Sequence, residues 1–243
     1  MQKIFGLIGS YLGHSFSPGY FNSRFHAAGI DAIYKTFEIP SISEFPKLLQ
    51  DNPGICGLNV TIPYKKAVIP YLDTMDYHAS QIGAVNCIQV SESGLKGYNT
   101  DWLGFGKSIS SRLRPQHSKA LILGNGGAAP AVRYWLDQHR IKSLTVTRTP
   151  QEETLLFEDL RPEVLAEYKI IINTTPLGMS PEVQGFPPIP YEAINASHLL
   201  FDLIYNPAKT IFLREGENRG ATVLNGLEML HAQAEASWII WNS

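Results

Sequence analysis

A seven-residue segment that begins at position 59, Asn-Val-Thr-Ile-Pro-Tyr-Lys, carries an amide, a hydroxyl and an ammonium group at the predicted end of a strand. Successive side chains of an extended chain point to opposite faces, so Asn59 and Thr61 should share one face. Val60 and Ile62 should pack behind it. Pro63 lacks an N–H group and should end the strand, with Lys65 just beyond it. These groups suit a small hydroxylated ligand. The alternative is a polar strand end with a solvated lysine.

A second chemical signal is a glycine-rich turn between an apolar strand at 120–123 and a helical pattern at 128–138. In this context glycines permit a tight turn, and the helix N–H groups can meet a pyrophosphate. Ala129 stands where the third small residue of such a fingerprint is expected. The turn therefore predicts a dinucleotide site made by Gly124, Gly126, Gly127, Ala128 and Ala129.

The choice of dinucleotide is indicated at the end of the next strand. About 20 residues after the turn, an acidic residue would bind the ribose 2′-OH of NAD. The sequence has Thr147-Arg148-Thr149 instead, and an arginine flanked by hydroxyls suits the 2′-phosphate of NADP. The alternative is a surface arginine, and Glu152 and Glu153 would oppose a phosphate if they point inward. Because only one arginine follows this strand, mixed use of NADP and NAD stays open.

The elements that position these groups indicate an α/β protein. Short apolar strands alternate with helical patterns, and near-continuous apolar strands in the second part favour a parallel sheet covered on both faces. The expected strands are 4–9, 33–38, 55–62, 86–90, 95–98, 120–123, 144–147, 170–173 and 199–203. The expected helices are 18–28, 43–49, 101–113, 128–138 and 226–241, and the last should pack back against the first domain.

Composition narrows the class of partner. The chain has 243 residues, is 44% hydrophobic and has a formal net charge of -2 without runs of like charge, so we expect a small-molecule substrate and neither nucleic acid nor membrane. Cys56 and Cys87 should be reduced thiols, and no histidine or cysteine spacing predicts a metal site. Without a leader-like or membrane-spanning stretch, we expect a cytoplasmic protein, either monomer or homodimer.

The whole chain resembles the shikimate dehydrogenase family. The resemblance is carried, in order, by segments 9–18, 59–65, 83–86, 98–101, 124–129, 147–149, 173–179, 202–207 and 225–230, followed by Gln233. It implies NADP-dependent interconversion of shikimate and 3-dehydroshikimate in chorismate and aromatic amino-acid biosynthesis. It also implies a substrate-binding domain, 1–101 plus 226–243, a Rossmann-like doubly wound NADP-binding domain, 102–225, and a cleft between them.

The resemblance assigns further roles. Ser15 and Ser17, at the start of the Pro18 helix, would hold the substrate carboxylate, although Ser17 would serve equally as an N-cap. The ring hydroxyls would bind Asn59, Thr61, Asn86, Asp101 and Gln233, with Tyr205 nearby. The nicotinamide would contact Thr175, Met179 and Gly226. The alternatives are turn, cap and packing roles, and Asp101 in particular is also suited to capping a helix.

Ketone reduction by hydride leaves negative charge on oxygen, so a proton donor must lie beside that oxygen. Lys65 and Asp101 are the candidate catalytic residues: Lys65 would transfer the proton, and Asp101 is expected to orient its ammonium group and the reacting hydroxyl. Two other interpretations stay open. One is a quinate/shikimate dehydrogenase with relaxed use of substrate and of NAD or NADP, and the other is a non-catalytic relative that senses ligand.

Overall fold

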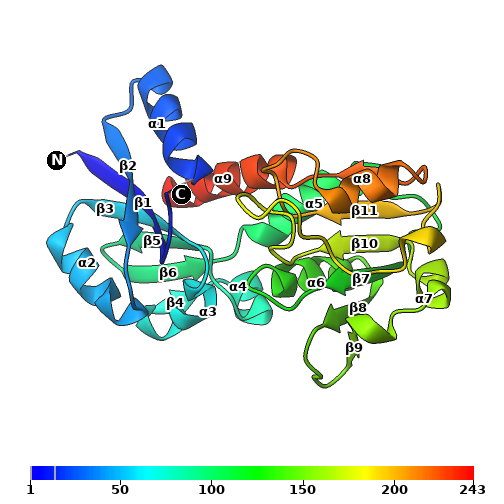
Figure 1. Ribbon diagram of the computed structural model, residues 1–243. Coiled ribbons are helices and arrows are strands. Elements are labelled where there is room, and N and C mark those ends of the chain that lie inside the picture. Colours follow the sequence, from blue (N-terminus) through cyan, green and yellow to red (C-terminus); the bar gives the residue numbers. More distant parts are fainter. Residues whose placement is uncertain (1, 14) are drawn as a thin grey trace. The chain divides into compact units, whose positions relative to one another are not determined.

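The chain forms two compact units in a computed structural model that describes residues 2–13 and 15–243 (Figure 1). Unit 1 comprises Met1–Thr100 and Ala234–Ser243, and unit 2 comprises Asp101–Gln233. Met1 and His14, the latter within the 9–18 segment of the family resemblance, lie outside the described residues. Each unit has its own sheet and its own core, as the predicted α/β class requires.

Unit 1 contains a mixed six-stranded sheet. In chain order its strands are β1 (Lys3–Gly9), β2 (Ala32–Glu38), β3 (Ile55–Val60), β4 (Thr74–Met75), β5 (Cys87–Ser91) and β6 (Gly94–Tyr98). The spatial order is β2-β1-β3-β5-β6-β4, with β1 parallel to β2 and β3 while β5 is antiparallel to β3 and β6. The beginning of β5 therefore lies at the edge where β3 and β6 end, and the register pairs Cys87 with both Asn59 and Tyr98.

The helices of unit 1 cover both faces of this sheet. They are α1 (Phe16–Ala28), α2 (Phe45–Asp51), α3 (Tyr64–Ala67), α4 (Tyr77–Ile82) and the last part of α9 (Leu227–Trp241). On one face α2, α3 and α4 enclose a core that includes Leu58. On the other face α1 and α9 pack together, and the rings of Phe5 and Trp241 stack with centroids 5.0 Å apart. This confirms that the carboxy-terminal helix packs back against the first domain.

Unit 2 contains six parallel strands: β7 (Lys119–Leu123), β8 (Lys142–Thr147), β9 (Thr154–Leu156), β10 (Ile170–Asn173), β11 (Leu199–Asp202) and β12 (Thr222–Leu224). Their spatial order is β12-β11-β10-β7-β8-β9. If β7 is counted as strand 1 and the sheet is read from the β9 edge, the order is 3-2-1-4-5-6. This is the strand order of dinucleotide-binding sheets. The direction of winding reverses between β7 and β10, where such sheets bind their ligand.

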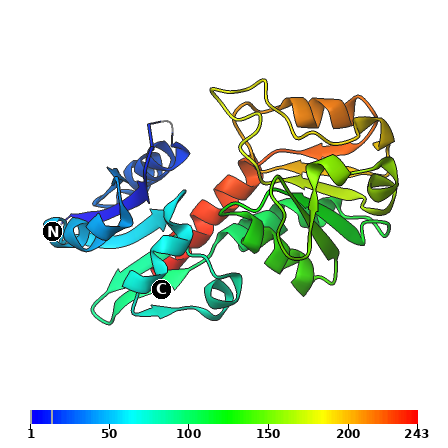
Figure 2. The same cartoon turned by 60° about the horizontal axis from the view of Figure 1, so that its bottom comes forward.

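Both faces of the unit 2 sheet are covered, which explains its apolar strands. Residues alternate along β7: Ile122 joins the core beneath α5 (Asp101–Ile109) and α6 (Ala129–Gln138). Leu121 joins the core beneath α7 (Pro162–Glu167) and α8 (Ile211–Glu217). In Figure 2 the orange α8 and the green α5 and α6 lie on opposite sides of the sheet. The doubly wound prediction is confirmed.

One detail of the predicted strand at 55–62 is wrong. The strand ends at Val60, and Ile62 is 66% exposed instead of packed behind the sheet. The Thr61 N–H still donates to the Ile8 carbonyl at 2.9 Å, but the Tyr64 N–H then donates to the Thr61 carbonyl and closes a turn. The short elements β4, β9, β12, α3, α4, α7 and α8 were not expected from sequence. Among the described residues, no helix is both long and apolar enough to cross a membrane.

Candidate active site

The polar segments of unit 1 meet at one edge of its sheet. This edge holds the carboxyl ends of β1, β3 and β6 and the beginning of β5, because β5 runs antiparallel to its neighbours. There the Thr61 methyl group lies so close to Gly9 that a Cβ added to Gly9 would stand 2.8 Å from it. The Val60 N–H donates to the Asn86 carbonyl at 2.9 Å. The edge therefore brings Asn59, Thr61 and Asn86 into one neighbourhood.

Asn59 is held in a single orientation. Its Oδ1 accepts a 2.8 Å hydrogen bond from the Tyr34 hydroxyl, and its Nδ2 donates to the Asn86 carbonyl at 3.2 Å and to Ser237 Oγ at 2.9 Å. Burial raises the pKa of the Tyr34 phenol well above its usual value, although a hydrogen bond with Ser17 lowers it, so the phenol stays neutral and can donate. Sequence reasoning missed Tyr34 because it lies on a strand without a polar motif.

Asn86 links the site to the start of α5. The Thr100 N–H donates to Asn86 Oδ1 at 2.6 Å, and Asn86 Nδ2 donates to Thr100 Oγ1 at 3.0 Å. Both side chains are buried. Asp101 follows Thr100 directly, is itself buried, and is the first residue of α5. The backbone that carries Asp101 is thus fixed by hydrogen bonds on its amino-terminal side.

The two serines lie at the beginning of α1, and their positions settle the capping alternative. Ser15 is the N-cap residue, its backbone is extended, and its side chain makes no capping hydrogen bond. Ser17 is inside the first turn, so the interpretation of Ser17 as the N-cap is wrong. The first turn contains no acidic side chain. Two hydroxyls and the unsatisfied N–H groups of a 13-residue helix form an environment that favours an anion.

Lys65 lies in the short helix α3 and is half-buried. The backbone around it is anchored twice. The preceding Tyr64 hydroxyl donates to the Ile39 carbonyl at 2.6 Å, and the Lys65 carbonyl accepts from the Val85 N–H at 2.7 Å. This anchoring sets the position from which the long Lys65 side chain extends.

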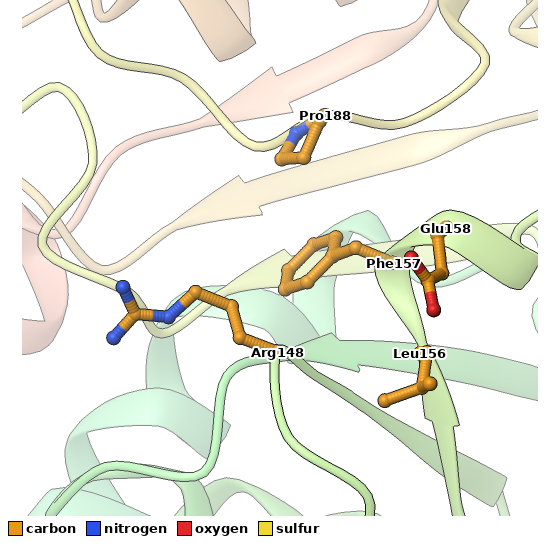
Figure 3. Close-up of a pocket in the computed structure, with 5 residues that line it drawn as sticks. All are labelled: Arg148, Leu156, Phe157, Glu158 and Pro188. Carbon is orange, nitrogen blue, oxygen red and sulfur yellow. The ribbon is translucent and has the colours of Figure 1, made fainter.

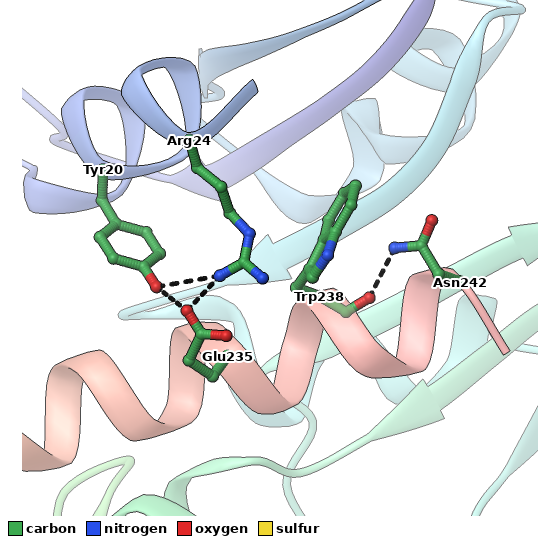
Figure 4. Close-up of polar contacts among 5 residues, drawn as sticks. All are labelled: Tyr20, Arg24, Glu235, Trp238 and Asn242. Carbon is green, nitrogen blue, oxygen red and sulfur yellow. Dashed lines mark hydrogen bonds and ion pairs between the residues drawn. The ribbon is translucent and has the colours of Figure 1, made fainter. Parts of the chain in front are cut away.

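Within unit 1, α9 is attached to α1 by a polar cluster that the sequence did not reveal (Figure 4). The Tyr20 hydroxyl and the Arg24 guanidinium both bind the Glu235 carboxylate. The guanidinium also lies 5.5 Å from the centroid of the Trp238 ring. These contacts hold α9 beside the helix that begins with the two serines.

Three predicted substrate residues belong to unit 2. Asp101 begins α5, Tyr205 follows β11, and Gln233 lies on the first part of α9. A Cβ added to Gly104 of α5 would stand 2.6 Å from the Met229 carbonyl and 3.3 Å from Gln233 Cβ. Gly104 therefore permits α5 and α9 to pack closely beside Gln233.

The glycine turn of unit 2 lies where the strand order reverses. Gly124 has φ +96°, a conformation that favours glycine, and an added Cβ would stand 2.8 Å from the Thr175 methyl group. Thr174 Oγ1 donates to the carbonyls of Leu123 and Gly124 at 2.8 and 3.2 Å. The turn after β7 is thus fastened to the loop after β10.

The same turn fits a pyrophosphate. The nearest atom to a Cβ added at Gly126 is 4.0 Å away, so the turn has an open side. Ala128 is the N-cap of α6 and has no side-chain capping bond, and Ala129 begins the helix. The Ala129 N–H donates to the Gly126 carbonyl at 3.2 Å and Pro130 has no N–H. Among the described residues, the N–H groups just before α6, those of Gly127 and Ala128, have no backbone acceptor and can therefore meet phosphate oxygens.

Arg148 follows β8 and lines a pocket of about 440 Å³ together with Leu156, Phe157, Glu158 and Pro188 (Figure 3). The turn that presents it is held by a 2.7 Å hydrogen bond from Thr147 Oγ1 to the Thr149 carbonyl. The guanidinium is exposed and points away from the Glu158 carboxylate in Figure 3. The acidic side chain that lines the pocket is Glu158; neither Glu152 nor Glu153 is among the lining residues.

The three residues expected at the nicotinamide lie on loops at the carboxyl edge of the unit 2 sheet. Thr175 Oγ1 donates to Asn173 Oδ1 at 2.7 Å, and Met179 is 48% exposed. Gly226 has no room for a side chain, because an added Cβ would overlap the Leu203 backbone. Its N–H donates to the Ile204 carbonyl at 3.0 Å. This close packing accounts for glycine at position 226.

Unit 2 has a doubly wound parallel sheet with an open glycine turn at its point of reversal, and unit 1 is a second α/β unit with a polar sheet edge. This combination defines a two-domain dinucleotide-binding protein. Residues 7–88 match the family model of the shikimate dehydrogenase substrate binding domain. The chain is 40% identical to a shikimate dehydrogenase (NADP(+)) of Clostridium beijerinckii, over 99% of this chain and 92% of the relative. The chain therefore belongs to the shikimate dehydrogenase family.

Solved structures agree with this assignment. The shikimate 5-dehydrogenase of Thermus thermophilus, in complex with NADP(H) and shikimate, is 29% identical, with a TM-score of 0.87 over 98% of this chain and 93% of that one. A quinate dehydrogenase of Corynebacterium glutamicum in complex with NAD is 27% identical, with a TM-score of 0.87 over 99% and 93%. The fold is thus shared by relatives that differ in substrate and cofactor.

Proposed function

We propose that this chain is an NADP-dependent shikimate dehydrogenase, an oxidoreductase that reversibly reduces 3-dehydroshikimate to shikimate in chorismate biosynthesis. The observation that carries the proposal is the similarity to shikimate dehydrogenases (NADP(+)) over almost the whole chain, at 40% identity for the Clostridium beijerinckii relative. It is supported by the glycine turn at the reversal point of unit 2 and by the polar sheet edge of unit 1. Unit 2 carries the groups proposed for the cofactor, and unit 1 carries most of the groups proposed for the substrate.

The substrate is held through its carboxylate and its ring hydroxyls. Ser15, Ser17 and the first N–H groups of α1 bind the carboxylate, because that helix start carries donors and no acidic side chain. Asn59 still has acceptor capacity on Oδ1, since a carbonyl oxygen has two lone pairs and Tyr34 uses one. The other groups that bind the substrate are Thr61, Lys65, Asn86, Asp101, Tyr205 and Gln233.

Lys65 transfers the proton at the reacting oxygen. During reduction its ammonium group donates a proton to the oxygen on which negative charge develops, and during oxidation the amine takes the proton back. Asp101 orients the ammonium group and the reacting hydroxyl. NADP, when bound, supplies or accepts the hydride.

The cofactor is held by three parts of unit 2. The pyrophosphate is received by the turn Gly124, Gly126, Gly127 and Ala128, and by Ala129, the first residue of α6. Thr147, Arg148 and Thr149 bind the 2′-phosphate at the pocket that Phe157 and Pro188 also line. Thr175, Met179 and Gly226 hold the nicotinamide end.

A second candidate function is a quinate/shikimate dehydrogenase that also uses NAD. It is favoured by Glu158, whose carboxylate lines the same pocket as Arg148 and would repel a 2′-phosphate. The quinate dehydrogenase of Corynebacterium glutamicum shows that this fold accommodates such a relative. A non-catalytic ligand sensor would have no need of the Lys65 ammonium and Asp101 carboxylate groups.

Steady-state rates with shikimate or quinate, each with NADP⁺ or NAD⁺, separate these functions. We expect the highest kcat/KM for shikimate with NADP⁺. A higher value for quinate with NAD⁺ would favour the second candidate. Binding of shikimate and NADP⁺ without turnover would identify a sensor.

A further inference from the structure

Unit 2 contains a buried carboxylate that none of the proposed catalytic or binding roles uses. Asp202 is the last residue of β11 and is paired in register with Asn173, the last residue of β10. Both side chains are fully buried. Asp202 Oδ1 accepts hydrogen bonds from Asn173 Nδ2 at 3.0 Å and from the Ile204 N–H at 3.1 Å, and Oδ2 accepts from Thr210 Oγ1 at 2.6 Å.

This carboxylate determines which way the Asn173 amide faces. An ionised carboxylate only accepts hydrogen bonds, so the NH₂ group of Asn173 must face Asp202. The Asn173 Oδ1 is then turned to the loop after β10, where it accepts from the Thr175 N–H at 3.0 Å and from Thr175 Oγ1 at 2.7 Å. The methyl group of Thr175 in turn packs against Gly124. Asp202 therefore acts through Asn173 on the loop that faces the glycine turn.

Asp202 also fixes the chain on its other side. The Ile204 N–H donates to Asp202, and the Ile204 carbonyl accepts from the Gly226 N–H at 3.0 Å. Thr210, the third partner of Asp202, stands beside Gly178, where an added Cβ would lie 3.4 Å from Thr210 Cβ. Every segment assigned to the nicotinamide end is thus joined to Asp202 through one or two contacts.

We propose that Asp202 is a positioning residue that sets the arrangement of Thr175, Met179 and Gly226 for the nicotinamide end of the cofactor. The inference rests on the proposed NADP-dependent function. Asp202 is enclosed by these loops and acts on the cofactor through Asn173 and Ile204. Burial raises the pKa of the Asp202 carboxyl to about 6, despite the lowering by its hydrogen bonds from Thr210, Ile204 and Asn173. Burying the Asp202 charge costs free energy, and the three donors that face its two oxygens offset that cost.

The test is the variant Asp202→Asn, which preserves shape but replaces one of the two acceptor oxygens by an NH₂ group. We expect the dissociation constant for NADPH to rise by about tenfold, in line with the loss of one hydrogen bond and its partner's orientation. The dissociation constant for shikimate should stay within error of the wild type. Asp137→Asn, the same chemical change near the end of α6, should alter none of these values.

Thr210 provides a second pair of variants in case Asp202→Asn does not fold. Thr210→Val removes the O–H donor to Asp202 Oδ2 and should weaken NADPH binding about threefold, whereas Thr210→Ser keeps the donor and should restore wild-type affinity. Unchanged NADPH affinity in a folded Asp202→Asn protein would overturn the inference. So would an equal loss of shikimate affinity and melting temperature, which would indicate a general structural role. Failure of the wild type to bind NADPH would instead overturn the proposed function on which the inference rests.

Discussion

Replacing Arg148 with alanine should separate the two nicotinamide cofactors. Among the described residues Arg148 forms no ion pair or hydrogen bond, and its side chain is exposed, so its removal should leave the free energy of unfolding within about 0.5 kcal/mol of the wild type. Any change in cofactor affinity can then be attributed to the lost arginine side chain and not to a less stable fold. The substitution removes one positive charge from the rim of the pocket formed with Phe157 and Pro188.

The size of the effect follows from the exposure of Arg148. Hydrogen bonds to charged groups contribute about 1.5–3 kcal/mol, and solvent screening at an exposed position favours the lower half of that range. A loss of about 1.5–2 kcal/mol corresponds to a rise of about 10–30-fold in KM for NADPH. NADH has no 2′-phosphate, so its KM should change less than twofold by the same reasoning.

The assay is initial-rate kinetics of 3-dehydroshikimate reduction with each cofactor, at low and at high ionic strength. The penalty for NADPH should shrink in high salt, because salt screens an exposed pair of charges. Lys142→Ala is the matched control, since it removes an exposed cation from the opposite end of the same strand. Equal changes for NADPH and NADH would refute the role of Arg148. Glu158→Gln should act in the opposite direction and lower KM for NADPH.

Four further predictions concern other parts of the chain. Lys65→Ala should lower kcat by about 10²–10⁴-fold with a smaller change in KM, and a wild-type kcat would exclude proton transfer by Lys65. Tyr34→Phe keeps the ring but removes the donor to the Asn59 amide, so KM for shikimate should rise about 3–10-fold while KM for NADPH stays constant; unchanged values for both would contradict the role of Tyr34. Gly124→Ala should lower the free energy of unfolding by about 1–3 kcal/mol and weaken NADPH binding, because φ is +96° and the new Cβ would meet Thr175; calorimetry showing wild-type stability and affinity would oppose this. Burial lowers the pKa of His198 below 6.5 in the folded chain, so its contribution to stability is present above pH 6.5 and is lost as pH falls from there towards the folded pKa. In urea titrations, the difference in free energy of unfolding between wild type and His198→Asn should narrow as pH falls over that range. A difference that widens would contradict the sign of the pKa shift.

Much of the fold was predictable because its signals are local. Residues 120–123 and 170–172 are continuously apolar, which is typical of parallel strands covered on both faces, and both segments lie in the centre of the unit 2 sheet. The glycine turn was recognisable because strand, turn and helix are consecutive in the sequence. In contrast, the exposure of Ile62 follows from the turn that the Tyr64 N–H closes with the Thr61 carbonyl, and the apolar alternation of the segment does not show that the strand ends before this turn.

Site residues were predictable where a sequence motif contains the reactive side chain. They were not predictable where their role depends on a side chain that is distant in the sequence. Lys65 and Arg148 follow strand ends and could be selected by residue type and place. Tyr34 and Ser237 hold Asn59 from positions 25 and 178 residues away, and such partners are known only once the chain is folded. Asp202 lay within a recognised segment, but its role depends on the register of β10 and β11 and on Thr210.

The most direct test of the proposed function is the initial rate of NADPH formation by the purified protein with shikimate and NADP⁺, compared with quinate and NAD⁺ under the same conditions. The proposal predicts saturable turnover of shikimate with NADP⁺, at a kcat/KM above that of every other pairing, and loss of that turnover in Lys65→Ala. Absence of turnover despite measurable binding of both ligands, or faster oxidation of quinate with NAD⁺, would contradict it.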